Sequence, residues 1–121
     1  MSFAAVDRLH RSAEFLSLQR RGARSQSTHF VVYAGKFHDD DDRSRLGVTV
    51  SRRVGNAVKR NRIKRRVREC FRLTLRERIP RGVSMVVIAR AGAADLDSPA
   101  INAELVTATL GLSRKLKAPQ P

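Results

Sequence analysis

The segment that says most about the fold and the function is residues 51–68, which read SRRVGNAVKRNRIKRRVR. From this segment onward, apolar or small side chains recur at intervals of three and four residues, at Ile63, Val67, Cys70, Phe71 and Thr74. This spacing places them on one face of an α-helix. The pattern predicts a long helix from about Asn56 to Ile79 whose apolar face packs on the rest of the domain.

The opposite side of this helix carries a polar stripe with the same helical spacing, formed by Asn61, Arg65, Arg68, Arg72 and Arg76. At a rise of about 1.5 Å per residue the stripe extends over about 22 Å, enough to follow several phosphates of a nucleic acid. Lys59–Arg68 contains seven cations and no carboxylate. Cations at this spacing repel one another, and a bound polyanion would relieve the repulsion.

Arg60 is expected to behave differently from the stripe, because its position on the helix is close to the apolar face. We expect its side chain to point back toward the sheet. Together with Arg52, Arg53 and the backbone N–H groups of the helix N-terminus, it would form an anion-binding corner.

The positive charge of the chain is concentrated in one region. The 121 residues carry 25 Lys and Arg against 11 Asp and Glu, a net charge of +14. Residues 43–81 hold 15 of these cations and two acids, a net charge of +13. A concentrated charge favours phosphate binding, and such binding depends strongly on salt. The expected partner is a nucleic acid, with RNA favoured because no helix-turn-helix, zinc-finger or leucine-heptad spacing indicates a DNA groove reader.

The remaining elements predict an α+β fold in the order α-β-β-α-β-α, a small two-layer sandwich. Strand-like segments are residues 29–34, 45–51 and 83–89. We expect the first two to form a hairpin across the acidic loop Asp39–Asp42, and the third, the most apolar, to be central. Helices are expected from Ser12 to about Arg21 and from Pro99 or Ala100 to about Lys115, with apolar residues of the last helix facing inward at Ile101, Leu105, Ala108 and Leu112.

Little in the sequence indicates catalysis or metal binding by the protein itself. Cys70 is the single cysteine and the three histidines are scattered, so neither an internal disulfide nor a zinc site is expected. Cys70 is expected to be buried and inert. No catalytic residue is predicted, and a self-sufficient nuclease is disfavoured because no carboxylate cluster or histidine pair is visible. A structural RNA-binding protein, such as a ribosomal protein, fits the composition equally well.

Further expectations concern location and organisation. The N-terminal residues lack the uninterrupted apolar stretch of a secretory signal, so a cytoplasmic protein without a membrane partner is expected. The length predicts a single domain, residues 1–116, followed by a flexible tail, residues 117–121.

Residues 45–68, RLGVTVSRRVGNAVKRNRIKRRVR, closely resemble the signature region of the bacterial ribonuclease P protein component. The resemblance includes the Arg60-Asn61-Arg62 core of its RNR motif, and it extends more faintly over most of the chain. It implies a ribosomal-protein-like fold with a left-handed β-α-β crossover. It also implies a division of labour, in which a catalytic RNA subunit uses Mg²⁺ to remove the 5′ leader of precursor tRNA. The protein subunit would bind both this RNA, in a 1:1 complex, and the leader.

The resemblance assigns two groups of binding residues. The RNR surface facing the RNA subunit would comprise Arg60, Asn61, Arg62, Lys64, Arg65 and Arg68, with Arg52 and Arg53 at its edge. Phe15 and Tyr33 would line a cleft between the sheet and the first helix that holds the single-stranded leader. Many relatives have a second aromatic on the first helix where this chain has Gln19, so stacking is not expected at that position.

Overall fold

The computed structural model describes residues 22–36 and 44–117, apart from the side chains of residues 36, 113 and 115–117. The sheet contains β1 (Ala23–Gln26), β2 (Phe30–Lys36), β3 (Leu46–Val50) and β4 (Val83–Ala89). The helical segments are α2 (Ala57–Cys70), a π-helical turn η2 (Phe71–Leu75), the short 3₁₀ turns η3 (Arg76–Arg78) and η4 (Ala93–Asp95), and α3 (Ser98–Lys117). The predicted first helix, Ser12 to Arg21, lies outside the described residues, as do the acidic loop and the last four residues.

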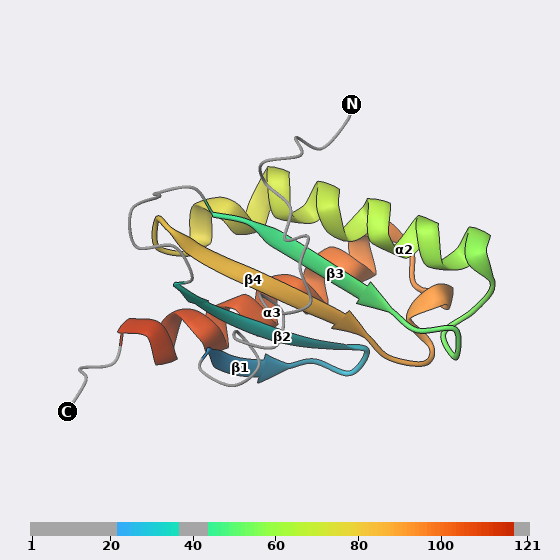
Figure 1. The fold of residues 1–121 in the computed structure, drawn as a ribbon, viewed down its shortest axis with the longest axis horizontal. Helices are drawn as coiled ribbons and strands as arrows, with labels where there is room; N and C mark the ends of the chain where they lie inside the picture. The colour runs from blue at the N-terminus through green and yellow to red at the C-terminus, as the bar shows by residue number, and fades with distance from the viewer. Residues whose placement is uncertain (1–21, 37–43, 118–121) are drawn as a thin grey trace.

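The four strands form one mixed sheet in the order β1-β2-β4-β3 (Figure 1). β4 is antiparallel to β2 and parallel to β3. The predicted central position of the third strand-like segment is therefore confirmed. Its buried residues lie on both faces of the strand.

Two predictions about the sheet were wrong. The segments now seen as β2 and β3 do not form a hairpin, because β4 lies between them. β1 was missed, because it has four residues, Ala-Arg-Ser-Gln, none of them β-branched or aromatic. β1 forms through its pairing with β2, where Ala23 lies opposite Ala34 and Gln26 opposite Val31.

The predicted long helix is present, but it is not a single regular α-helix. Regular α-helix ends at Cys70 and continues as the π turn and then the 3₁₀ turn to Arg78. Of the five residues predicted on the apolar face, Thr74 is half-buried and the other four are buried: Ile63, Val67, Cys70 and Phe71. The helix connects β3 to its parallel neighbour β4, which makes the predicted β-α-β unit; the left-handed sense of this connection remains a prediction.

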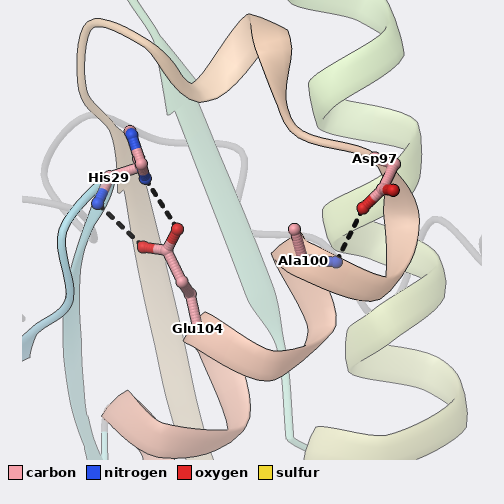
Figure 2. Close-up of polar contacts among 4 residues, drawn as sticks. All are labelled: His29, Asp97, Ala100 and Glu104. Carbon is pink, nitrogen blue, oxygen red and sulfur yellow. Dashed lines mark hydrogen bonds and ion pairs between the residues drawn. The ribbon is translucent and has the colours of Figure 1, made fainter.

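α3 begins one to two residues earlier than predicted. The side chain of Asp97 caps it by accepting a hydrogen bond from the N–H of Ala100 at 2.9 Å (Figure 2). All four predicted inward residues of α3 are buried: Ile101, Leu105, Ala108 and Leu112. The helix approaches β1 closely at Gly111, where a Cβ atom would lie 2.8 Å from Oγ of Ser25. A side chain at this position would require the Ser25 hydroxyl to move.

The main core lies between the sheet and the two helices. Phe30, Val32 and Ala34 of β2 and Met85 and Val87 of β4 belong to it. α3 packs on β1 and β2, whereas α2 packs along β3, and α3 runs behind the sheet in Figure 1. The predicted α+β class with helices packed on a sheet is confirmed. We call the sheet face that carries this core the inner face, and the opposite one the outer face.

Candidate nucleic-acid interface

Helix α2 presents exposed cations from its first turn onward. Asn56 caps its N-terminus by accepting a hydrogen bond from the N–H of Lys59 at 2.9 Å, and no acidic residue occupies the first turn. Of the predicted RNR residues, Asn61, Arg62 and Arg65 are exposed. This part of the helix can therefore offer positive charge and hydrogen-bond donors to a polyanion without rearrangement.

The predicted stripe is not uniformly open. Asn61 and Arg65 are exposed, but Arg68, Arg72 and Arg76 are half-buried. The guanidinium carbon of Arg76 lies 5.3 Å from the centre of the Phe71 ring, a cation–π contact. The π turn that starts at Phe71 changes the helical phase, so Arg72 and Arg76 no longer continue the row of Asn61 and Arg65. The open part of the stripe is confined to its N-terminal half.

The side of α2 that faces α3 uses its polar groups within the fold. Nη1 of Arg66 donates to the backbone carbonyl of Leu96 at 2.7 Å. The thiol of Cys70 donates to Oδ1 of Asn102 on α3, with sulfur and oxygen 3.1 Å apart. Burial raises the pKa of this thiol to about 11. Cys70 is buried as predicted, and Arg66, although part of the cation run, has a structural contact.

The residues of the predicted anion-binding corner come from the turn after β3 and from the first turn of α2. Arg52 and Arg53 are exposed in the turn after β3, which the N–H of Val54 closes by donating to the carbonyl of Ser51 at 3.1 Å. Arg60 is half-buried, as expected for a side chain near the apolar face, and its Nε is buried without a hydrogen-bond partner among the described residues. Whether the three guanidiniums bind one anion remains a prediction.

The outer face of the sheet carries the described part of the predicted leader cleft. Tyr33 of β2 lies opposite Val86 of β4, and the half-buried Tyr33 and Ile88 pack against the fully buried Val86. The other predicted cleft residue, Phe15, and Gln19 lie outside the described residues. Tyr33 is therefore on the side of the sheet opposite α3, where a half-buried aromatic can contact a base.

One polar cluster at the edge of this outer face was not predicted. Oε1 of Gln26 accepts hydrogen bonds from Nη2 of Arg24 at 3.1 Å and from Nη2 of Arg90 at 2.8 Å. Arg24 and Gln26 belong to β1, and Arg90 directly follows β4. Because the strand β1 was missed, the sequence offered no signal that these three residues lie together.

A second unpredicted contact ties the β1–β2 turn to α3 (Figure 2). Nδ1 of His29 lies 2.6 Å from Oε2 of Glu104, and the backbone N–H of His29 donates to Oε1 of the same carboxylate at 2.8 Å. Partial burial raises the pKa of Glu104, but the hydrogen bonds from His29 outweigh it and hold this pKa below its ordinary value. A carboxylate ionised at neutral pH can only accept, so Nδ1 carries the hydrogen in this contact.

Neither a metal-ligand cluster nor a membrane-spanning helix occurs in the described parts of the chain. Within residues 22–36 and 44–117, no group of three or more His, Cys, Asp and Glu is arranged to hold a metal ion. No described helix is long and apolar enough to cross a membrane.

Comparison with known proteins agrees with this architecture. The family model described as Ribonuclease P matches residues 3–112. A ribonuclease P protein component from Desulforapulum autotrophicum is 43% identical over 104 residues, covering 86% of each chain. One from Gluconacetobacter diazotrophicus is 46% identical over 91 residues, covering 72% of this chain and 77% of the relative.

Solved structures of such proteins have the same fold. The ribonuclease P protein of Staphylococcus aureus superposes with a TM-score of 0.76 at 34% identity, over 84% of this chain and 91% of that chain. The protein from Thermotoga maritima superposes with a TM-score of 0.73 at 35% identity, over 88% and 96% of the two chains. Because the family model spans nearly the whole sequence and both the sequence relatives and the structures agree with it, this chain belongs to the family of ribonuclease P protein components.

Proposed function

We propose that this chain binds the catalytic RNA of ribonuclease P and the 5′ leader of precursor tRNA, and so assists the RNA in removing the leader. The observation that carries the proposal is the exposed surface of α2, with the cations Arg62 and Arg65 and the amide of Asn61, in a chain of this family. Exposed guanidiniums are suited to phosphate contacts, and such contacts account for much of the affinity of proteins for nucleic acids.

In this proposal the two binding surfaces have different partners. The exposed residues of α2 contact the RNA subunit in a 1:1 complex, together with the half-buried Lys64 and Arg68 and the Arg52–Arg53–Arg60 corner. The single-stranded leader binds by stacking and phosphate contacts to the outer face of the sheet at Tyr33. Phe15, which lies outside the described residues, is proposed to line the same cleft. The protein supplies no catalytic residue; Mg²⁺ serves the RNA subunit, and the cations of the protein lower the repulsion between the two RNAs.

The test is cleavage of a precursor tRNA by a bacterial ribonuclease P RNA at low Mg²⁺, with and without this protein. We expect the protein to restore cleavage at the mature 5′ end. Repulsion between RNAs is strongest when divalent ions are scarce, so the stimulation should fall as Mg²⁺ is raised. Protein that binds the RNA but restores no cleavage would contradict the proposal and favour a structural RNA-binding protein.

Protein freed of RNA is the necessary control for cleavage by the chain itself. One similar structure is described as a Staphylococcus aureus mutant with defective mRNA degradation activity. Cleavage of a precursor tRNA or an mRNA by the RNA-free protein would favour a nuclease function for this chain as well. We expect none.

A further inference from the structure

The outer face of the sheet joins two groups of cations that lie far apart in the sequence. Opposite residues on neighbouring strands point to the same face, so Gln26, Val31, Ile88 and Thr49 form one row across the sheet. The next row contains Arg24, Tyr33, Val86 and Gly47. Exposed Arg52 and Arg53 follow β3 at one end of these rows, and the Arg24–Gln26–Arg90 cluster occupies the other.

The geometry of this cluster is suited to an anion. Two guanidiniums converge on one oxygen, Oε1 of Gln26, at 3.1 and 2.8 Å. The side chain between the two guanidiniums is a neutral amide, which adds no negative charge to the cluster. A carboxylate in the same place would neutralise part of the positive charge. Gln26 and Arg90 are exposed, and no described carboxylate lies within ion-pair distance of Arg90. The remaining N–H groups of the Arg90 guanidinium can therefore donate to a phosphate oxygen.

The surface between the two groups of cations fits a single nucleic-acid strand. Tyr33 lies directly opposite Arg24, and Ile88 lies between Val31 and Thr49 in the neighbouring row. From β1 to β3 the distance is three strand spacings, about 14 Å. Cations at both ends with an aromatic and apolar side chains between them match a strand whose phosphates are bound at the ends and whose bases lie on the middle.

We propose that the Arg24–Gln26–Arg90 cluster binds the phosphate backbone of the precursor tRNA leader, at the end of the leader track farthest from α2. Arg24 and Arg90 contact phosphate, and Gln26 is a positioning residue that holds the two guanidiniums together. This proposal rests on the proposed function and deepens it, because it adds a leader-binding segment on β1 and past the end of β4.

The experiment measures the affinity of the reconstituted holoenzyme for precursor tRNAs whose leaders are lengthened one nucleotide at a time, with mature tRNA as the leaderless reference. Arg24→Met with Arg90→Met removes both charges and keeps the alkyl stems. Gln26→Glu keeps an acceptor between the arginines but adds a negative charge. Arg114→Met is the matched control, because Arg114 is exposed on α3, which packs on the inner face.

For the wild-type holoenzyme, we expect affinity to rise once the leader is long enough to reach β1. The double variant should lose this rise, by about tenfold, and its binding should depend less on salt. The slope of log K against log salt should decrease by about 0.7 for each phosphate that is no longer neutralised, about 1.4 for the pair. Gln26→Glu should weaken binding of long leaders to at least the same extent, whereas Arg114→Met should match the wild type.

Two results would overturn the inference. The first is a double variant that binds every leader as the control does, with an unchanged salt slope. The second is a double variant that loses affinity equally for mature tRNA or for the RNA subunit alone, which would place the cluster against another RNA. Failure of the proposed function is distinguishable from both, because then the wild-type protein itself would not bind precursor tRNA or stimulate its cleavage.

Discussion

The two sides of helix α2 carry the same kind of side chain and use it differently. Arg65 is exposed, whereas its neighbour Arg66 is half-buried and donates to the carbonyl of Leu96. On the side of α2 that faces α3, Cys70 also has a structural contact, the hydrogen bond from its thiol to Asn102. A run of cations in a sequence therefore contains both binding residues and structural ones, and the direction of each side chain on the helix decides between them.

The largest effect is expected on the exposed side. Replacing Arg62 and Arg65 together with Ala should lower the affinity for the RNA subunit at least tenfold and reduce cleavage at low Mg²⁺, since two phosphates are no longer neutralised. The free energy of unfolding should change by less than about 0.5 kcal/mol, because both side chains are exposed. Filter binding and thermal unfolding measure the two quantities. Unchanged RNA affinity in a folded variant would remove the helix from the RNA interface.

Arg66→Ala is the comparison for Arg65→Ala, because it removes the same kind of charged side chain from the next residue, on the side of α2 that faces α3. It should lower the free energy of unfolding by about 1–2 kcal/mol, because the Leu96 carbonyl loses a charged donor. Denaturant unfolding compares it with Arg65→Ala. Equal stabilities of the two single variants would show that the hydrogen bond to Leu96 contributes nothing measurable.

Glu104→Gln tests a polar contact of α3 far from the cation run. At neutral pH the variant should be less stable by about 1 kcal/mol, because the hydrogen bonds from His29 favour the ionised carboxylate. The pKa of Glu104 is lowered in the folded state from an ordinary value of 4.5. Its contribution is therefore complete above pH 4.5 and is lost as the pH falls through the lower folded value.

The measurement for Glu104 is denaturant unfolding of both proteins across the acid range. The difference in stability should be present at neutral pH and shrink below pH 4.5. A difference that persists unchanged at low pH would mean that ionisation of Glu104 does not stabilise the fold.

The smallest effect is expected at Cys70, where the prediction concerns reactivity. Burial raises the pKa of its thiol to about 11, and the thiolate is the reactive form. Alkylation should therefore be slow in the folded protein at neutral pH and become rapid in denaturant. Mass spectrometry follows the reaction. Rapid labelling under native conditions would show that α2 and α3 separate readily at this point.

The sequence predicted best where one pattern had a single solution. The helical spacing of Ile63, Val67 and Cys70 placed the apolar face of α2 correctly, and the apolar segment at residues 83–89 is the central strand β4. It predicted worst in two situations. β1 was missed because it is too short to show a pattern, and the pairing of β2 with β4 was missed because β4 lies about fifty residues later in the chain.

The same division applies to the candidate site. The amino-acid sequence was sufficient to predict a cation-rich helix with one apolar face and a resemblance to the ribonuclease P signature, because helical periodicity and charge are local properties. The folded chain was needed to show that Arg66 is tied to Leu96, that His29 meets Glu104, and that Arg24 and Arg90 converge on Gln26. These contacts depend on strand order and helix docking, which are set by how the whole core packs.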